Sequence, residues 1–512
     1  MSRSPFCFRL RLASISTERE TMTDTVDVAT HAGTVRGLQR PGSAAFLGIP
    51  FAEPPTGERR FAAPVPHAPW SGVLDATQYG ATPQRKALSE ITIIPEPSVP
   101  GESTLNVNVF TPRPGDTEAA LPVLVYIHGG GYVAGSPASP WYDGAAFNRD
   151  GVVTVSVSYR LGFDGFGWIQ DAPMNRGVLD WILALEWVRD NIDRFGGDPS
   201  RVTIAGQSAG GGAVLTLLAV PRAADLFERV ISISGATADT ELGVAEAAGR
   251  RLAELVGVEP TRAGLSSIPE GRILELQGKI AAATVEDGSN PLASLAALVN
   301  DGLVLGPVVD GDLLPTGVRD ALAGGVGRSK ELLLGATDNE FNMALAPHEE
   351  ALAAVDPVLA LDGLGVAAPD AARYVESHPG LSTAAILGQF VTDSVFRSKA
   401  VDYARAREEG GAPAWLYRFA WPSTVMGGAT HCLDVPFFFD DLDAEGVEVI
   451  TGPNPPRDLA ADVHGAAVAF IAAGAPGWSP YEEAGRAVMV YDVPSTVVVD
   501  GYADAEVSAP VR

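Results

Sequence analysis

Cysteine is nearly absent from this chain of 512 residues, which contains only Cys7 and Cys432. Two cysteines so far apart in the sequence form neither a disulfide framework nor the paired spacing of a zinc site. Disulfide frameworks are typical of oxidising compartments, so we expect this protein in the cytoplasm.

Basic side chains are also scarce. The chain has 36 Lys and Arg against 63 Asp and Glu, which gives a net charge of −27. Because phosphate groups are bound by clustered Lys and Arg, this balance disfavours nucleic acid and anionic membranes as partners. Long apolar runs are missing as well, since Gly or a charge interrupts them within about ten residues, and we expect no membrane span.

The segment 1–21 lacks the continuous apolar stretch of a secretory signal, because its apolar residues from Phe6 to Leu12 alternate with Cys7, Arg9 and Arg11. We interpret it as a disordered extension or the product of an upstream start codon. The folded part is then expected to begin near Met22.

Buried strands alternate with helices along most of the remaining chain. Residues 25–50 predict an antiparallel hairpin and a third strand. Apolar runs and an amphipathic pattern over 178–195 then predict a parallel sheet covered by helices on both faces. Further strands are expected at 105–110, 121–127, 152–159, 201–205, 229–234, 303–309, 331–334 and 415–419, with a last one at 488–493, and further helices at 211–220 and 459–472.

No internal repeat and no long linker divides the sequence. Two Ala- and Glu-rich stretches, at about 236–300 and 345–410, are mostly helical in pattern. We therefore expect a single domain over 22–512, with these two stretches as helical insertions.

A serine lies between a predicted strand and a predicted helix. The motif G-x-S-x-G, with Ser208 at its centre, follows the strand at 201–205 and precedes the helix at 211–220, an order typical of a nucleophile elbow. A Cβ at Gly206 or Gly210 would clash in the strained turn that exposes the serine hydroxyl. The start of the helix offers N–H groups and a positive dipole end to an oxyanion.

A serine nucleophile needs a base, and His431 is the best placed of the seven histidines. It lies in a glycine loop after a predicted strand and downstream of Ser208, as in the α/β-hydrolase order. The remaining histidines are expected to brace a loop, pack or face solvent: His31, His67, His128, His348, His378 and His464.

The third member should be a carboxylate that follows a strand between Ser208 and His431. Glu340, Asp310 and Asp338 all meet this condition, and spacing does not separate them. A glycine run at 129–131 follows another buried strand, where backbone N–H groups could approach the oxygen of a tetrahedral intermediate.

Taken together, these motifs resemble the type B carboxylesterases, an α/β-hydrolase family that includes bacterial para-nitrobenzyl esterases and cholinesterases. The resemblance covers most of the chain after Met22. It rests on five segments: F-L-G-I-P-F-A-E-P-P at 46–55, L-N-V-N-V-F at 105–110, H-G-G-G-Y at 128–132, F-G-G-D-P through G-Q-S-A-G-G at 195–211, and H-C-L-D-V-P-F at 431–437.

The resemblance implies an α/β-hydrolase fold, with a central, mostly parallel sheet, helices on both faces and helical insertions. It implies Glu340 as the acid of the catalytic triad and Ser234 as a residue that supports this acid. It also implies that the oxyanion is held by the N–H groups of Gly130, Gly131 and Ala209.

Three positions and one longer stretch depart from the family pattern. Gln207 stands where a Glu is common, and Thr104 where a disulfide cysteine is frequent. Phe341 replaces the Gly that usually follows the acid. The stretch 80–102 has no aromatic residue, whereas cholinesterases hold their quaternary ammonium with a tryptophan there.

The sequence therefore predicts a serine carboxylesterase that hydrolyses esters of small to medium size through an acyl-enzyme. It needs no cofactor and no metal, and we expect a monomer or homodimer. One alternative is a hydrolase of amides, carbamates or phthalate-type diesters. A remote alternative is a non-catalytic binding relative, which would have no need of the three triad residues.

Overall fold

The computed structural model describes residues 24–83, 93–281, 299, 303–342, 345, 348–482 and 484–508. Residues 1–21, where we expected a disordered extension, lie outside the described residues. So does part of the expected insertion at 236–300.

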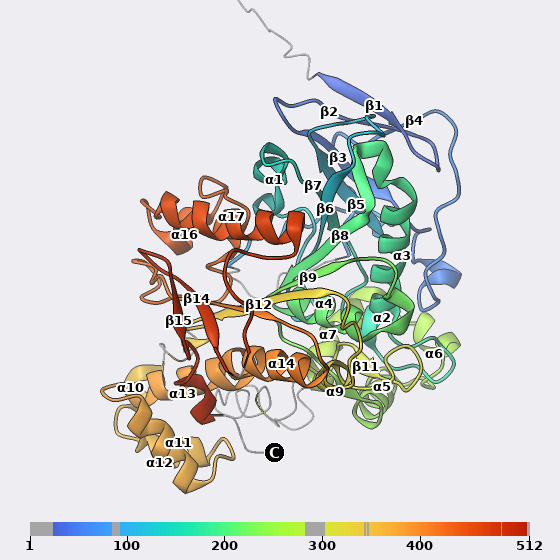
Figure 1. Ribbon diagram of the computed structural model, residues 1–512. Coiled ribbons are helices and arrows are strands. Elements are labelled where there is room, and N and C mark those ends of the chain that lie inside the picture. The colour runs from blue at the N-terminus through green and yellow to red at the C-terminus, as the bar shows by residue number, and fades with distance from the viewer. Residues whose placement is uncertain are drawn as a thin grey trace, which may run out of the picture.

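One sheet of thirteen strands runs through the molecule (Figure 1). Its strands are β1 (Thr25–Ala29), β2 (Thr34–Leu38), β3 (Ala44–Pro50), β4 (Val73–Asp75), β5 (Asn106–Thr111), β6 (Leu121–Ile127), β7 (Val153–Val157), β8 (Gly197–Gln207), β9 (Arg229–Ile233), β12 (Glu331–Thr337), β13 (Trp415–Phe419), β14 (Ala487–Tyr491) and β15 (Thr496–Val499). Their order is β1-β2-β3-β5-β7-β6-β8-β9-β12-β13-β14-β15, and β4 pairs with β2.

The centre of the sheet is parallel from β7 through β6, β8, β9, β12 and β13 to β14. Antiparallel pairs flank it, from β1 to β5 at one end and between β14 and β15 at the other. The predicted parallel sheet and the predicted antiparallel start are both confirmed.

Helices cover both faces of the sheet, and further helices lie outside these layers. They are α1 (Ala145–Arg149), α2 (Gly162–Phe166), α3 (Arg176–Asn191), α4 (Ala209–Ala219), α5 (Leu242–Val256), α6 (Arg262–Ser266), α7 (Glu270–Ala281), α9 (Val318–Ala323), α10 (Glu349–Leu352), α11 (Pro357–Asp362), α12 (Ala368–Ser377), α13 (Thr383–Thr392), α14 (Ser398–Glu409), α15 (Val435–Phe438), α16 (Val447–Thr451) and α17 (Arg457–Ala473). Short 3₁₀ turns span Gly57–Arg59, Pro140–Tyr142, Ile192–Phe195, Pro221–Ala223 and Ala505–Ser508, and a π-turn spans Asp393–Arg397.

Alternate residues of the central strands pack against different helices, because successive side chains of a strand point to opposite faces. On β6, Val123 and Val125 join the core formed with α3, α4 and α14. Leu124 and Tyr126 join the core formed with α15 and α17. Figure 1 shows α3 and α17 on opposite sides of the sheet.

The outlying helices bury apolar clusters of their own. Helices α10 to α13 enclose one cluster and α5 to α7 another, the second together with Phe61 and Phe163. No described helix is long and apolar enough to span a bilayer.

Two expected strands differ from the structure. The run at 303–309 forms a strand only at β11 (Val308–Val309), which pairs with β10 (Thr240–Glu241) outside the large sheet. Its apolar character has another cause: Leu305 packs into the cluster around α5 to α7. The strand at 488–493 ends at Tyr491 and is not the last, because β15 follows and pairs with it.

Candidate active site

Ser208 lies in the turn between β8 and α4. Its backbone has φ 58° and ψ −123°, a strained conformation for a residue with a side chain. The Ser208 N–H donates to the Ile233 carbonyl at 2.9 Å, which ties the turn to the end of β9. The predicted elbow geometry is therefore present in the structure.

The glycines on either side of the serine leave no room for a Cβ. A Cβ on Gly210 would lie 2.0 Å from the Ile127 carbonyl oxygen, and one on Gly206 would lie 2.4 Å from the backbone of Gly210. Strand β6, the turn and the first turn of α4 thus meet backbone to backbone.

The glycine run after β6 packs directly on this turn. A Cβ on Gly129 would lie 3.1 Å from the Ser208 Cβ. Gly130 and Gly131 have φ values of 109° and 60°, and a Cβ on Gly130 would lie 2.2 Å from the Ala134 carbonyl oxygen. Their sharply turned backbone continues from Gly129, the residue that lies against the elbow, where α4 begins at Ala209.

His431 and Glu340 form a close pair. The His431 Nδ1 lies 2.5 Å from Glu340 Oε2, and the Glu340 side chain is fully buried. The loops that carry them pair through their backbones, since the Asn339 N–H donates to the Ala429 carbonyl at 2.8 Å. The second carboxylate oxygen of Glu340 accepts the Thr337 N–H at 2.8 Å.

The other two candidate carboxylates bond elsewhere. Asp338 forms a bidentate pair with Arg418, and Asp310 accepts from the side chain of Asn175 at 2.9 Å. Of the three carboxylates that spacing left open, the structure thus brings Glu340 to the histidine.

Two opposing effects act on the pKa of His431. Burial disfavours the charged imidazolium and lowers this pKa, but the adjacent Cys432 sulfur and the Glu340 carboxylate together raise it by more. The net pKa of His431 lies well above its ordinary value of 6.5.

Two phenylalanines flank the His431 ring. The ring centres of Phe341 and Phe396 lie 5.5 and 5.1 Å from that of His431, and the two phenylalanine rings stack on each other. Phe396 belongs to the π-turn, a feature that is frequent at functional sites. The Phe341 that departs from the family pattern therefore forms part of an aromatic wall beside the base.

The residue before the serine also reaches the base. The side-chain nitrogen of Gln207 lies 3.1 Å from Nε2 of His431. Gln207 is buried, and sequence reasoning noted it only as a departure from the family pattern.

Ser234, expected to support Glu340, follows β9, and its N–H donates to the Gly335 carbonyl of β12 at 2.8 Å. Its hydroxyl oxygen is buried and has no hydrogen-bond partner among the described residues. The Thr337 N–H, at the end of β12, donates to the Glu340 carboxylate.

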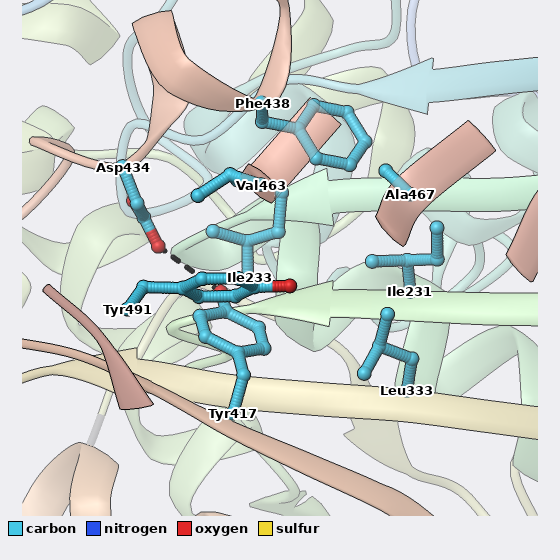
Figure 2. Close-up of a pocket in the computed structure, with 9 residues that line it drawn as sticks. All are labelled: Ile231, Ile233, Leu333, Tyr417, Asp434, Phe438, Val463, Ala467 and Tyr491. Atoms are coloured by element: carbon cyan, nitrogen blue, oxygen red, sulfur yellow. Dashed lines mark hydrogen bonds between the residues drawn. The ribbon is translucent and has the colours of Figure 1, made fainter. Parts of the chain in front are cut away.

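A small cavity lies on the α17 side of the sheet and is lined by Asp434 and eight other residues, all of them apolar or tyrosine (Figure 2). Tyr417 donates to one oxygen of Asp434 at 3.0 Å, and the other oxygen has no described partner. Burial, reinforced by the charge of Glu340, raises the pKa of Asp434 to about 7. Sequence reasoning missed this acid, whose only signal was its place three residues after His431.

Among the described residues, no group of three or more His, Cys, Asp and Glu side chains could hold a metal ion. The chemistry that this site offers is that of a hydroxyl, an imidazole and a carboxylate beside glycine N–H groups.

Comparison with known proteins points to one family. A model of the carboxylesterase family matches residues 24–359. The para-nitrobenzyl esterase of Bacillus subtilis (strain 168) is 33% identical over 493 residues, which cover 92% of this chain and 96% of the relative. Carboxylesterase 1D of Mus musculus is 34% identical over 426 residues, 76% of this chain and 74% of the relative.

Solved structures agree. A thermophilic PNB esterase superposes with a TM-score of 0.80 at 30% identity, covering 94% of this chain and 99% of that chain. The Geobacillus stearothermophilus carboxylesterase EST55 gives 0.79 at 31% identity, with the same coverage. The α/β-hydrolase fold expected from the sequence is thereby confirmed.

Proposed function

Because the chain belongs to the carboxylesterase family and is a carboxylic-ester hydrolase, we propose that Ser208, His431 and Glu340 are its catalytic triad. The observation that carries this proposal is the 2.5 Å bond between Glu340 and His431, whose other ring nitrogen faces the residue next to Ser208. The relatives are named esterases, so the two alternatives are not favoured: a hydrolase acting mainly on amides, carbamates or phthalate-type diesters, and a non-catalytic binding relative.

In the proposed mechanism, the Ser208 hydroxyl oxygen attacks the ester carbonyl carbon while its proton passes to Nε2 of His431. Glu340 accepts the Nδ1–H bond, which keeps the imidazole in the tautomer that can take this proton and stabilises the imidazolium that forms. The imidazolium then gives the proton to the leaving alcohol, and the acyl group stays on Ser208.

Deacylation repeats these steps with water. His431 takes a proton from the water, the hydroxide attacks the acyl carbonyl, and Ser208 recovers its proton as the acid leaves. We assign the oxyanion to the N–H groups of Gly130, Gly131 and Ala209. A donor of this kind lowers the barrier by about 3–4 kcal/mol.

Neutral esters with small to medium acyl chains are the proposed substrates. The aromatic wall of Phe341 and Phe396 offers apolar contacts beside the base. Binding a quaternary ammonium usually requires aromatic faces that each contribute roughly 0.5–2 kcal/mol, and the stretch 80–102 supplies none. A higher kcat/KM for butyrylcholine than for a neutral butyrate ester of similar reactivity would contradict this.

For the whole protein, we propose a single domain over 22–512, a cytoplasmic location, a monomer or homodimer, and no nucleic-acid partner. The net charge of −27 and the scarcity of cysteine support these proposals. Cell fractionation and sedimentation of the purified protein test them.

Replacing Ser208 with Ala tests the triad. We expect the fold to persist and kcat on a small aryl ester to fall by about 10³-fold or more. Ser200→Ala is the matched control, because Ser200 is an exposed serine on the same strand whose hydroxyl donates to the nearby Asp198. A Ser208→Ala protein within tenfold of wild type would remove Ser208 from the mechanism.

A further inference from the structure

The two ring nitrogens of His431 have different neighbours. Nδ1 is bonded to Glu340, whereas Nε2 lies 3.1 Å from the side-chain nitrogen of Gln207. Within the described parts of the chain, no hydrogen bond joins Ser208 to His431. The nitrogen that must accept the serine proton is therefore occupied by the residue that precedes the serine.

The direction of this bond follows from the tautomer. A neutral imidazole that donates from Nδ1 to Glu340 has only an acceptor at Nε2, and the amide NH₂ of Gln207 is a donor. A glutamate, which is common at this position in the family, has only acceptors when ionised and would favour the charged imidazolium. The two side chains thus act on His431 in opposite directions.

The Gln207 side chain is held in place from two sides. It is 1% exposed, and its Oε1 atom lies against the glycine loop, where a Cβ on Gly129 would be only 3.0 Å away. The amide is thereby confined between Gly129 and the His431 ring, at the junction of the glycine loop and the elbow.

We propose that Gln207 is a positioning residue whose side-chain amide holds Nε2 of His431 in the resting enzyme and yields this atom to Ser208 for the reaction. This inference rests on the proposed roles of Ser208 and His431. Gln207 makes no bond to the substrate in this account. Its amide donor favours the neutral imidazole, in opposition to Glu340 and Cys432, which raise the pKa of His431, and it competes with the serine for the same acceptor.

A substitution at Gln207 leaves the identity of the other titratable groups that face His431 unaltered. They are Glu340 on the loop after β12, Cys432 beside the ring and Asp434 at the start of α15. A difference between Gln207 variants therefore reports the Gln207 contact alone.

Gln207→Met tests the proposal because it keeps the length of the side chain and removes the donor. We would measure the rate of Ser208 labelling by a fluorophosphonate, and kcat/KM on p-nitrophenyl acetate, from pH 5 to 9. Without the donor, the neutral imidazole loses one hydrogen bond, so the pKa of His431 should rise. The acid limb of each profile, where the rate increases with pH, should then move to higher pH by about 0.5–1 unit. Without the competitor, the plateau at high pH should rise by about 2–10-fold. In each assay, the pH profile of Gln207→Met should therefore cross that of the wild type.

Gln207→Glu should move the acid limb up by about 1–3 units, because a carboxylate stabilises the imidazolium. The matched control is Gln277→Met, the same change at a partly buried glutamine of α7 whose Oε1 accepts the Phe163 N–H. Its profile should superimpose on that of the wild type.

If Gln207→Met changes the rate by the same factor at every pH, the proposal is overturned, because Gln207 then has only a packing role. If Gln207→Met does not fold, Gln207→Glu decides, and an unmoved acid limb overturns the proposal. A wild-type protein that is not labelled at Ser208 would instead refute the proposed triad, so the two failures are distinguishable.

Discussion

Gly210→Ala is the most direct test of how the elbow is built. Gly210 lies in the first turn of α4, two residues after Ser208. The added Cβ would meet the Ile127 carbonyl oxygen at 2.0 Å and the His128 carbonyl oxygen at 2.9 Å. Neither neighbour is a flexible side chain, because both oxygens belong to the backbone at the end of the central strand β6.

The size of the effect follows from these distances. Cβ atoms essentially never come within 3.0 Å of another heavy atom, so the start of α4 and the end of β6 must separate by about 1 Å. Overpacking of this kind costs about 1–3 kcal/mol of stability. A displacement of about 1 Å at a catalytic group costs about 10²-fold in rate. We expect both losses together.

The assay is kcat/KM on p-nitrophenyl butyrate, combined with urea unfolding followed by circular dichroism. Gly278→Ala serves as control, because Gly278 is an exposed residue inside α7 with no atom within 4 Å of the added Cβ. This control should keep full activity and gain up to about 1 kcal/mol, since alanine is the better helix former. A Gly210→Ala protein with wild-type activity and stability would refute the close backbone contact.

Three further outcomes are expected. Glu340→Gln should lower kcat far more than Asp310→Asn, and the reverse ranking would mean that Asp310 is the acid. Glu340→Gln should also shift the acid limb of the kcat/KM profile to lower pH, because the charge that raises the pKa of His431 is gone. Asp434→Asn should become more stable than wild type as the pH rises from about 4 to about 7, because the folded pKa of Asp434 of about 7 lies above the ordinary 3.8 and its ionisation opposes folding. Above pH 7 the difference in the free energy of unfolding should stay constant, at up to about 4 kcal/mol. A difference in urea midpoint between variant and wild type that is the same at pH 5 and pH 8 would contradict this. Arg397→Leu should lower the free energy of unfolding in urea by about 3–5 kcal/mol, because it removes the buried guanidinium that pairs with Asp393 and Asp504. A loss below about 1 kcal/mol would show that these ion pairs add little stability.

The central sheet could be predicted because its strands are apolar runs of ordinary length. The predicted strands at 121–127 and 415–419 match β6 and β13 residue for residue. The apolar run at 303–309 was predicted to be a strand, but most of it is a loop that packs into the cluster around α5 to α7. A loop that packs in this way is as apolar as a strand. Strand β15 was missed because it is a short edge strand in which Val497 and Val499 are exposed and only Val498 packs against the core, so it lacks the buried apolar run of the central strands.

The site divides in the same way. The position of Ser208 could be predicted because an elbow needs glycines at fixed offsets, which is a local property of the sequence. The bond between Glu340 and His431 joins residues 91 positions apart, so spacing alone left Asp310 and Asp338 open. The contact of Gln207 with His431 and the burial of Asp434 depend on how loops pack, which no local pattern encodes.

The distances along the chain between these groups have a consequence for folding. Ser208 follows β8, Glu340 follows β12, and His431 follows β13, so 224 positions separate Gln207 from the imidazole it contacts. The early strands can pair and bury Trp181 while the later ones are still unstructured, and long-range pairings of this kind form slowly. Esterase activity is then a reporter of the completed sheet, and during refolding from urea it should return after the early phase of the tryptophan fluorescence change, to which Trp181 contributes and Trp415, Trp421 and Trp478 do not. Simultaneous recovery of the two signals would mean that the whole sheet forms in one step.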